Sequence, residues 1–163
     1  MSGIEIERKF LVKDDSYKQL AFADSVIRQG YLCDNPRCTV RVRLRAGEGS
    51  LTIKGPSDGQ GLSRYEFEKK ITADEASALL ALCPSEIIDK RRYLVRAGKH
   101  VFEVDEFHGA NEGLTVAEIE LGALDEPFTI LPFIGEEVTG DARYYNLSLS
   151  RCPFSTWGTS SRE

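Results

Sequence analysis

The sequence predicts an α+β fold in which about eight antiparallel strands close into a barrel, with a charged interior and with helices packed outside. Two observations lead to this prediction. Along most of the chain, apolar and polar residues alternate with a period of two, and turn-forming residues separate the alternating stretches. A few segments show instead the wider apolar spacing of helices. The 163 residues are enough for one domain with a substantial core.

The alternating stretches define the strands. We expect them at residues 4–12, 25–33, 38–46, 49–55, 63–71, 87–96, 100–108 and 114–122. The turns AGEGS, GPSDGQG and AGK connect neighbouring strands and are short enough for antiparallel hairpins.

Helical spacing appears at residues 14–22, 72–83 and 141–151. Thr72 is expected to cap the second of these helices, with Glu75 completing a capping box. Prolines in residues 125–138 predict an irregular crossing, and the end of the chain is small and polar, so it is expected to fray. The predicted organisation is one domain over residues 1–151 and a C-terminal tail over residues 152–163.

Composition, charge and cysteine spacing argue against several classes of protein. Hydrophobic residues make up 41% and charged residues 29%, as in globular rather than disordered or membrane-spanning chains. A net charge of -5 argues against nucleic-acid binding, and the four cysteines contain no CxxC pair, so we expect free, mostly buried thiols. No signal-peptide pattern is evident at the N-terminus. We therefore expect a cytoplasmic monomer or homodimer that binds neither nucleic acid nor membrane.

Charged residues occupy every second position in most of the expected strands, so each strand presents one charged face. The residues that share such faces are Glu5, Glu7 and Lys9; Arg41, Arg43 and Arg45; Arg64, Glu66, Glu68 and Lys70; Lys90 and Arg92; Glu103 and Asp105; and Glu118 and Glu120. Lys54 shares the face of Thr52. In an ordinary antiparallel sheet such a face lies in water, but the density of charges of both signs favours the lumen of a barrel.

A charged lumen requires a functional reason, because desolvation often outweighs the attraction within buried ion pairs. Arginine and lysine bind phosphate oxygens, and carboxylates hold hard cations such as Mg2+ or Mn2+. The alternating faces therefore indicate a site for a polyanion together with a divalent metal ion.

The order of these segments resembles a known family. The segments EIERKFLV, RQGYL, VRVRLR, LTIKG, SRYEFE, DKRRYLV, FEVDEF, LTVAEIEL and GEEVTGDARYYN are similar to those of the CYTH, or triphosphate tunnel metalloenzyme, family along nearly the whole chain. The resemblance implies an antiparallel eight-stranded tunnel that hydrolyses or rearranges triphosphates with a divalent metal ion. Its ExExK opening is a weak pattern alone, and the ordered series is the stronger signal.

The resemblance also implies roles for individual residues. The implied metal ligands are Glu5, Glu7 and Glu120, with Glu118 beside them as a catalytic residue. The implied substrate-binding residues are Lys9, Arg41, Arg43, Lys54, Lys90, Arg92, Glu68 and Asp105. Glu66, Glu68, Glu103 and Asp105 match further acids of the tunnel, for which binding a second metal ion, positioning water and orienting the bases are alternative roles. For Glu66 and Glu103 we expect the orienting role. Arg45, Arg64 and Lys70 lie near strand ends and are expected to be solvated.

Tyr31 and Lys90 are a further pair that the resemblance places together as catalytic residues. A neighbouring ammonium would lower the pKa of the Tyr31 phenol and favour a tyrosinate that activates water or orients the terminal phosphate. The alternative is that Tyr31 packs at a strand end.

The function that the resemblance favours is metal-dependent hydrolysis of inorganic tripolyphosphate to pyrophosphate and phosphate, through in-line attack of water. A class IV adenylyl cyclase and a thiamine triphosphatase are alternatives, because they would bind a triphosphate through the same charged residues. A non-catalytic polyphosphate-binding module is an alternative of another class, but it would leave the full set of acids unexplained.

Overall fold

A computed structural model describes residues 6–57 and 64–159 of the chain. The strands are β1 (Ile6–Val12), β2 (Ala23–Asn35), β3 (Cys38–Arg45), β4 (Glu48–Ser57), β5 (Arg64–Ile71), β6 (Ile88–Ala97), β7 (His100–His108), β8 (Thr115–Leu121) and β9 (Ile134–Glu137). The helices are α1 (Tyr17–Leu20), α2 (Ala73–Leu80) and α3 (Asn146–Arg151), with short 3-10 helices η1 (Gly109–Asn111), η2 (Ala142–Tyr144) and η3 (Phe154–Thr159). The α+β class is confirmed.

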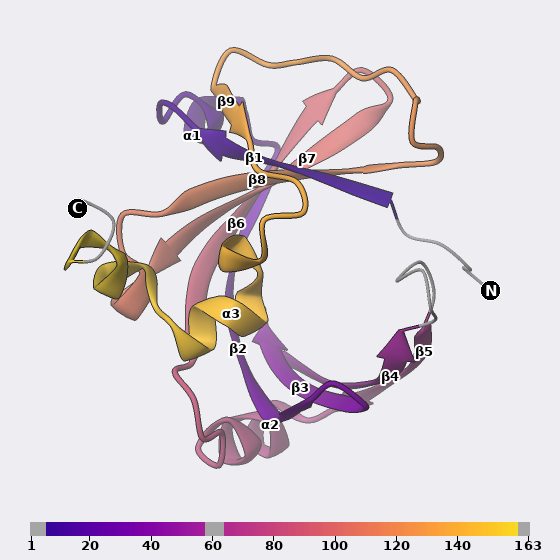
Figure 1. The fold of residues 1–163 in the computed structure, drawn as a ribbon, viewed down its shortest axis with the longest axis vertical. Helices are drawn as coiled ribbons and strands as arrows, with labels where there is room; N and C mark the ends of the chain where they lie inside the picture. Colours follow the sequence, from indigo (N-terminus) through magenta and orange to yellow (C-terminus); the bar gives the residue numbers. More distant parts are fainter. Residues whose placement is uncertain (1–5, 58–63, 160–163) are drawn as a thin grey trace.

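The strands form one curved antiparallel sheet rather than a closed barrel. Its nine strands lie in the order β5-β4-β3-β2-β6-β7-β8-β1-β9, so β5 and β9 are its two edges. Figure 1 shows β4 and β5 on the opposite side of the curve from β1 and β8. The expected eight-stranded closed barrel is therefore wrong in this structure: within the described ranges, β9 rather than β5 pairs with the second edge of β1.

The alternation of apolar and charged residues places the two kinds of side chain on opposite faces of this sheet. Residues opposite each other in adjacent strands share a face, as do Lys9 with Glu118, Glu103 with Glu118 and Arg92 with Asp105. The intervening apolar residues form the core on the convex face, including Phe102, which is completely buried. The register therefore gathers the charged faces on the concave side, as predicted.

Helix α2 covers part of the convex face. The Thr72 hydroxyl accepts a hydrogen bond from the Glu75 backbone, and the Glu75 carboxylate accepts one from the Thr72 backbone, which confirms the capping box. Ala76 and Leu80 pack on Val42 of β3. A side chain at Gly49 of β4 would lie 2.8 Å from the Thr72 carbonyl oxygen, so the glycine permits this close approach.

Strand β9 lies within the segment expected to be an irregular crossing. It pairs antiparallel with β1, and Arg8 of β1 forms an ion pair with Glu137 at 2.5 Å. The preceding residues 125–133 are without helix or strand. The expectation was thus correct for the proline-containing part and wrong for the four residues of β9.

Up to residue 159, the C-terminal segment is held by aromatic packing, so the expectation that it frays is wrong for this part. Trp157 lies edge-on to Tyr144 and Phe154, with ring centroids 5.3 and 5.1 Å apart. The Phe154 backbone N–H donates to the buried Asn111 side chain at 2.8 Å. These contacts hold η2 and α3 against the sheet, and Figure 1 shows α3 on its concave side.

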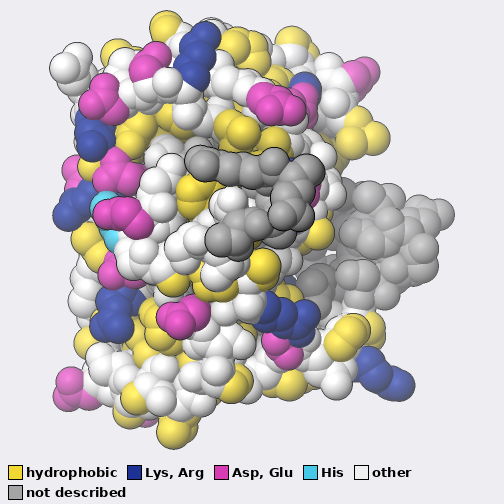
Figure 2. All heavy atoms as spheres, turned by 60° about the vertical axis from the view of Figure 1, so that its left-hand side comes forward, with side chains coloured by type: hydrophobic (Ala, Val, Ile, Leu, Met, Phe, Trp, Pro, Cys, Tyr) yellow, Lys and Arg dark blue, Asp and Glu magenta, His cyan; other side chains and the backbone are white. Residues whose placement is uncertain are grey.

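Outside the concave face the surface is mixed. Figure 2 shows acidic and basic side chains in small groups between hydrophobic ones on one face of the molecule. All four cysteines are free as expected, but they are half-buried or exposed rather than mostly buried. No helix among the described residues is long and apolar enough to span a membrane.

Replacement of Trp157 by alanine is expected to lower the free energy of unfolding by about 1–3 kcal/mol, because it removes the ring that joins Tyr144 to Phe154. Urea denaturation measures the change. Leu124→Ala is the control, since Leu124 is 82% exposed and its truncation should cost less than about 0.5 kcal/mol. Equal stability of the two variants would contradict a fixing role for the C-terminal segment.

Candidate functional site

The concave face of the sheet encloses a cavity of about 530 Å³, which we call the trough. Its lining includes side chains from strands far apart in the sequence and from the start of α3. The lining residues are Glu7, Lys9, Tyr31, Thr39, Arg41, Arg43, Thr52, Lys54, Glu66, Glu68, Arg92, Glu103, Glu118, Tyr145, Asn146 and Leu147. Most of the residues predicted for the site therefore lie together around one space.

Lys9 and Glu118 form the wall of the trough contributed by β1 and β8. The Lys9 ammonium lies 3.3 Å from a Glu118 carboxylate oxygen and donates to the Tyr144 carbonyl oxygen at 3.1 Å. The Tyr145 ring centroid is 5.2 Å from the same ammonium. Burial alone would raise the pKa of Glu118, but Lys9 and a hydrogen bond with Glu7 outweigh it, and the net shift is downward.

The carboxylates of this wall have the chemistry of a cation site. Glu7 and Glu118 are in hydrogen-bond contact, and Glu7 lies directly opposite Glu120 in the β1–β8 register. Two carboxylates this close need a shared proton or a cation between them, so the donors present fit a hard divalent ion. Glu120 is exposed and lies outside the trough lining, and Glu5 falls outside the described residues. Within residues 6–57 and 64–159, no three acidic, histidine or cysteine side chains are clustered closely enough to form a complete metal site.

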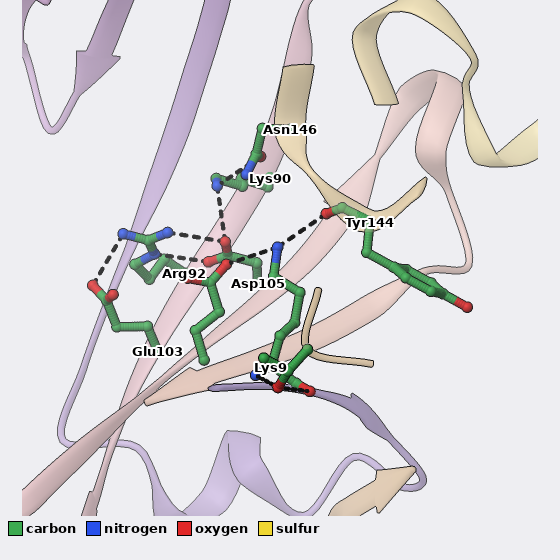
Figure 3. Close-up of polar contacts among 9 residues, drawn as sticks. Lys9, Lys90, Arg92, Glu103, Asp105, Tyr144 and Asn146 are labelled. Atoms are coloured by element: carbon green, nitrogen blue, oxygen red, sulfur yellow. Dashed lines mark hydrogen bonds and ion pairs between the residues drawn. The ribbon is translucent and has the colours of Figure 1, made fainter. Parts of the chain in front are cut away.

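At the base of the trough, a mostly buried ion network links β6 to β7. Asp105 accepts hydrogen bonds from Lys90 at 2.8 Å and from two nitrogens of Arg92 at 2.8 and 2.9 Å. Arg92 also contacts Glu103 at 3.0 Å. The Lys90 ammonium donates further to the Asn146 side-chain oxygen at 3.0 Å. Figure 3 shows Lys90 and Arg92 both directed to the Asp105 carboxylate, Lys90 from above and Arg92 from the left in this view.

The network shifts the pKa values of its members. Complete burial lowers the pKa of Lys90 to about 8, against the attraction of Asp105. Burial would raise the pKa of the Asp105 carboxyl, but Lys90 and Arg92 together hold it well below its usual range. Lys90 and Asp105, both predicted to bind substrate, are buried under the lining rather than part of it.

Arg41 and Arg43 form the basic wall contributed by β3, and they differ from the other cations of the trough. Arg41 donates to the Thr52 hydroxyl at 3.2 Å, and Arg43 donates to the Gln29 side-chain oxygen at 2.8 Å. No carboxylate in the described part of the chain forms an ion pair with either guanidinium, whereas Lys54 lies 3.9 Å from Glu66. Burial and the nearby Arg41 and Arg92 lower the pKa of Arg43 to about 10.

The remaining predicted side chains are Glu68 and the bases that were expected to be solvated. Glu68 lines the trough and accepts a hydrogen bond from the Thr52 hydroxyl at 3.3 Å. Lys70 is exposed as expected, but Arg45 is half-buried and donates to the Ser25 hydroxyl. The Arg64 side chain lies outside the described part of the structure.

Tyr31 lines the trough, but its surroundings do not favour the expected tyrosinate. Burial raises the pKa of its phenol, and the lowering effects of Arg41 and Arg43 are smaller. The Lys90 ammonium is directed to Asp105 and Asn146 instead. The burial of Tyr31 thus opposes the tyrosinate that the resemblance implies.

Sequence reasoning missed several members of the site. Tyr145, Asn146 and Leu147 belong to a segment expected only as an outer helix, and Gln29 was one polar residue among many. No pattern in the sequence marks them, because their contacts depend on how the sheet curves around α3.

Comparisons with known proteins agree with this geometry. The model of the CYTH domain family matches residues 3–148. The inorganic triphosphatase of Acetivibrio thermocellus is 44% identical over 156 residues, covering 95% of this chain and 98% of that protein. The inorganic triphosphatase of Nitrosomonas europaea is 37% identical over 154 residues, covering 90% and 96%.

Solved structures show the same similarity in three dimensions. A structure described as an inorganic triphosphatase superposes with a TM-score of 0.68 at 31% identity, covering 90% of this chain and 93% of the other. A putative adenylyl cyclase from Hippeastrum has a TM-score of 0.54 at 15% identity over 74% of this chain and 80% of the other, which shows a shared fold only.

Replacement of Asp105 by asparagine is expected to lower the free energy of unfolding by about 3–5 kcal/mol at pH 7, because two buried cations lose their shared anion. The pKa of Asp105 is lowered by folding, so its stabilisation is fully present above the unfolded pKa near 3.8 and is lost as the pH falls toward the folded value. The difference between wild type and variant should hence stay constant from pH 7 to about 5 and shrink below about 4.

Denaturant unfolding across this pH range measures the difference. Asp125→Asn is the control, since Asp125 is exposed and should change stability by less than about 0.5 kcal/mol. A small, pH-independent effect of Asp105→Asn would show that the network does not stabilise the fold.

Proposed function

Because the chain belongs to the CYTH domain family, we propose that it hydrolyses inorganic tripolyphosphate to pyrophosphate and phosphate with the help of a divalent metal ion. The observation that carries this proposal is the division of charge in the trough. Arg41 and Arg43 lie without a carboxylate partner in the described chain on one wall, and Glu7 and Glu118 lie in contact on another. A chain of phosphates with a bound cation complements both walls at once.

The basic residues hold the substrate. Arg41 and Arg43 present guanidinium groups suited to the oxygens of a phosphate chain, and Lys9, Lys54 and Arg92 line the same space. Charge develops on the leaving bridging oxygen as the terminal phosphoryl group departs, and the fixed cations balance the charge of the phosphate oxygens in the bound substrate and in the transition state alike. Asp105 keeps Arg92 in place from below.

The acidic residues serve the metal and the water. We propose Glu5, Glu7 and Glu120 as metal ligands, supported by the opposition of Glu7 and Glu120 in neighbouring strands. Bound Mg2+ or Mn2+ would neutralise charge on phosphate oxygens. Glu118, as a carboxylate beside Lys9, can accept a hydrogen bond from the attacking water and orient it. Water then forms one P–O bond while the bond to the pyrophosphate leaving group breaks, with no covalent enzyme intermediate.

Purified protein is expected to release phosphate from tripolyphosphate in the presence of Mg2+ or Mn2+, faster than from ATP, and to lose activity with a chelator. The charged groups that line the trough are suited to bind phosphate oxygens, and such binding needs no nucleoside. Parallel assays of phosphate and cyclic nucleotide on tripolyphosphate, ATP, thiamine triphosphate and pyrophosphate test it. Cyclic AMP formation without phosphate release, or tight tripolyphosphate binding without turnover, would refute the proposal in favour of a cyclase or a binding module.

Replacement of Glu7 or Glu120 by glutamine is expected to raise the Mn2+ concentration for half-maximal activity by about tenfold or more, because each variant keeps its shape and loses one anionic ligand. Activity is measured against Mn2+ concentration at saturating tripolyphosphate. Glu112→Gln is the control, since this carboxylate is 70% exposed and lies outside the trough. If both variants kept the metal dependence of the wild type, these residues would not be the ligands.

A further inference from the structure

Gln29 of β2 is a buried amide behind the basic wall of the trough. Its side chain is 1% exposed, and its oxygen accepts a hydrogen bond from Arg43 Nε at 2.8 Å. The orientation of the amide is fixed by chemistry, because a guanidinium has only donors and must face the oxygen. Gln29 and Arg43 lie directly opposite each other in the β2–β3 register.

The nitrogen of the same amide has no acceptor among the described residues. The amide also lowers the pKa of the nearby Tyr31 phenol, against the larger effect of burial, but no hydrogen bond of good geometry joins the two groups. A buried donor without an acceptor costs about 1–3 kcal/mol, and an apolar side chain of the same length would avoid this cost. The contact with Arg43 is therefore the one hydrogen bond of good geometry that the amide forms among the described residues.

The neutrality of this contact sets it apart from others in the trough. Arg92 is held by the carboxylates of Glu103 and Asp105, so much of its charge is compensated within the protein. Arg43 is held by an uncharged oxygen, and the repulsions from Arg41 and from Arg92 are each larger than the attraction of Asp105. A neutral acceptor fixes Nε of a guanidinium while leaving its charge available to a ligand.

We propose that Gln29 is a positioning residue for phosphate binding: it holds Arg43 through Nε without neutralising it, so that the two terminal nitrogens of the guanidinium face the phosphate oxygens in the trough. This inference rests on the proposed function for the identity of the anion. The effect that we infer for Gln29 is only on the affinity of the basic wall for a phosphate chain.

Two replacements separate the hydrogen bond from the charge. Gln29→Glu keeps an acceptor for Arg43 and adds a negative charge, so it should raise the melting temperature of the free protein and raise KM for tripolyphosphate at least tenfold. Gln29→Met removes the acceptor and also the unpaired donor, so it should raise KM several-fold with little change in melting temperature. In both variants kcat should change less than KM, because Arg43 binds the phosphates before and during reaction.

Binding without turnover provides a second readout. With a chelator present, tripolyphosphate should raise the melting temperature of the wild type by several degrees, less for Gln29→Met and least for Gln29→Glu. Gln19→Glu is the matched control, since it adds the same charge at an exposed position of α1 and should behave as wild type. Gln29→Met should have no further effect on KM in an Arg43→Ala background, because it acts through Arg43.

The outcomes distinguish the inference from the proposed function. A wild type that binds but does not hydrolyse tripolyphosphate refutes the function, and the melting-temperature series still tests Gln29. Variants that lose stability and activity in parallel, with KM and the ligand-induced shift unchanged, would show that Gln29 is only structural and would overturn the inference. Independent effects of Gln29→Met and Arg43→Ala would overturn it as well.

Discussion

The concave face depends on the contact of one buried carboxylate with two cations. Asp105 lies between Lys90 and Arg92, and without it three basic side chains, including Arg43, would repel one another in a poorly solvated space. The antiparallel pairing of β6 with β7 sets Arg92 opposite Asp105 and thereby places this anion. The pairing of these two strands therefore also determines the charge balance of the site.

The period of two in the sequence was sufficient to predict which side chains share the concave face. Arg41 and Arg43 of β3 lie opposite Thr52 and Ser50 of β4, as the alternation requires. The alternation could not predict how deeply each of these side chains is buried. Lys90 follows the same pattern as Arg92 but is fully buried, because Asn146 of α3 covers it from the concave side. Such depth depends on a contact between residues far apart in the chain.

Closure of the sheet was the part of the fold that strand number could not determine. A barrel requires the two edge strands of its sheet to pair, whereas here β9 occupies the second edge of β1 and, in the described part of the chain, the edges β5 and β9 do not pair with each other. This strand has only four residues, and Gly135 lies so close to β1 that a side chain there would come within 3.0 Å of the Leu11 carbonyl oxygen. Alternation over four residues is too short a signal to recognise. The aromatic packing of Trp157 was likewise hidden in a small, polar segment, since a ring's partners are set by the fold.

The acceptors around the trough divide into two kinds, and this division connects stability with binding. Cations at the base of the trough are held by carboxylates, which compensate their charge and allow them to be buried. The arginines of the basic wall are held by neutral oxygens of Thr52 and Gln29, so their mutual repulsion persists in the free protein. Under the proposed function, a phosphate chain would relieve that repulsion on binding, and part of its binding free energy would come from the repulsion already present in the free protein. Full compensation by acidic residues would give a more stable protein with a weaker hold on its anion.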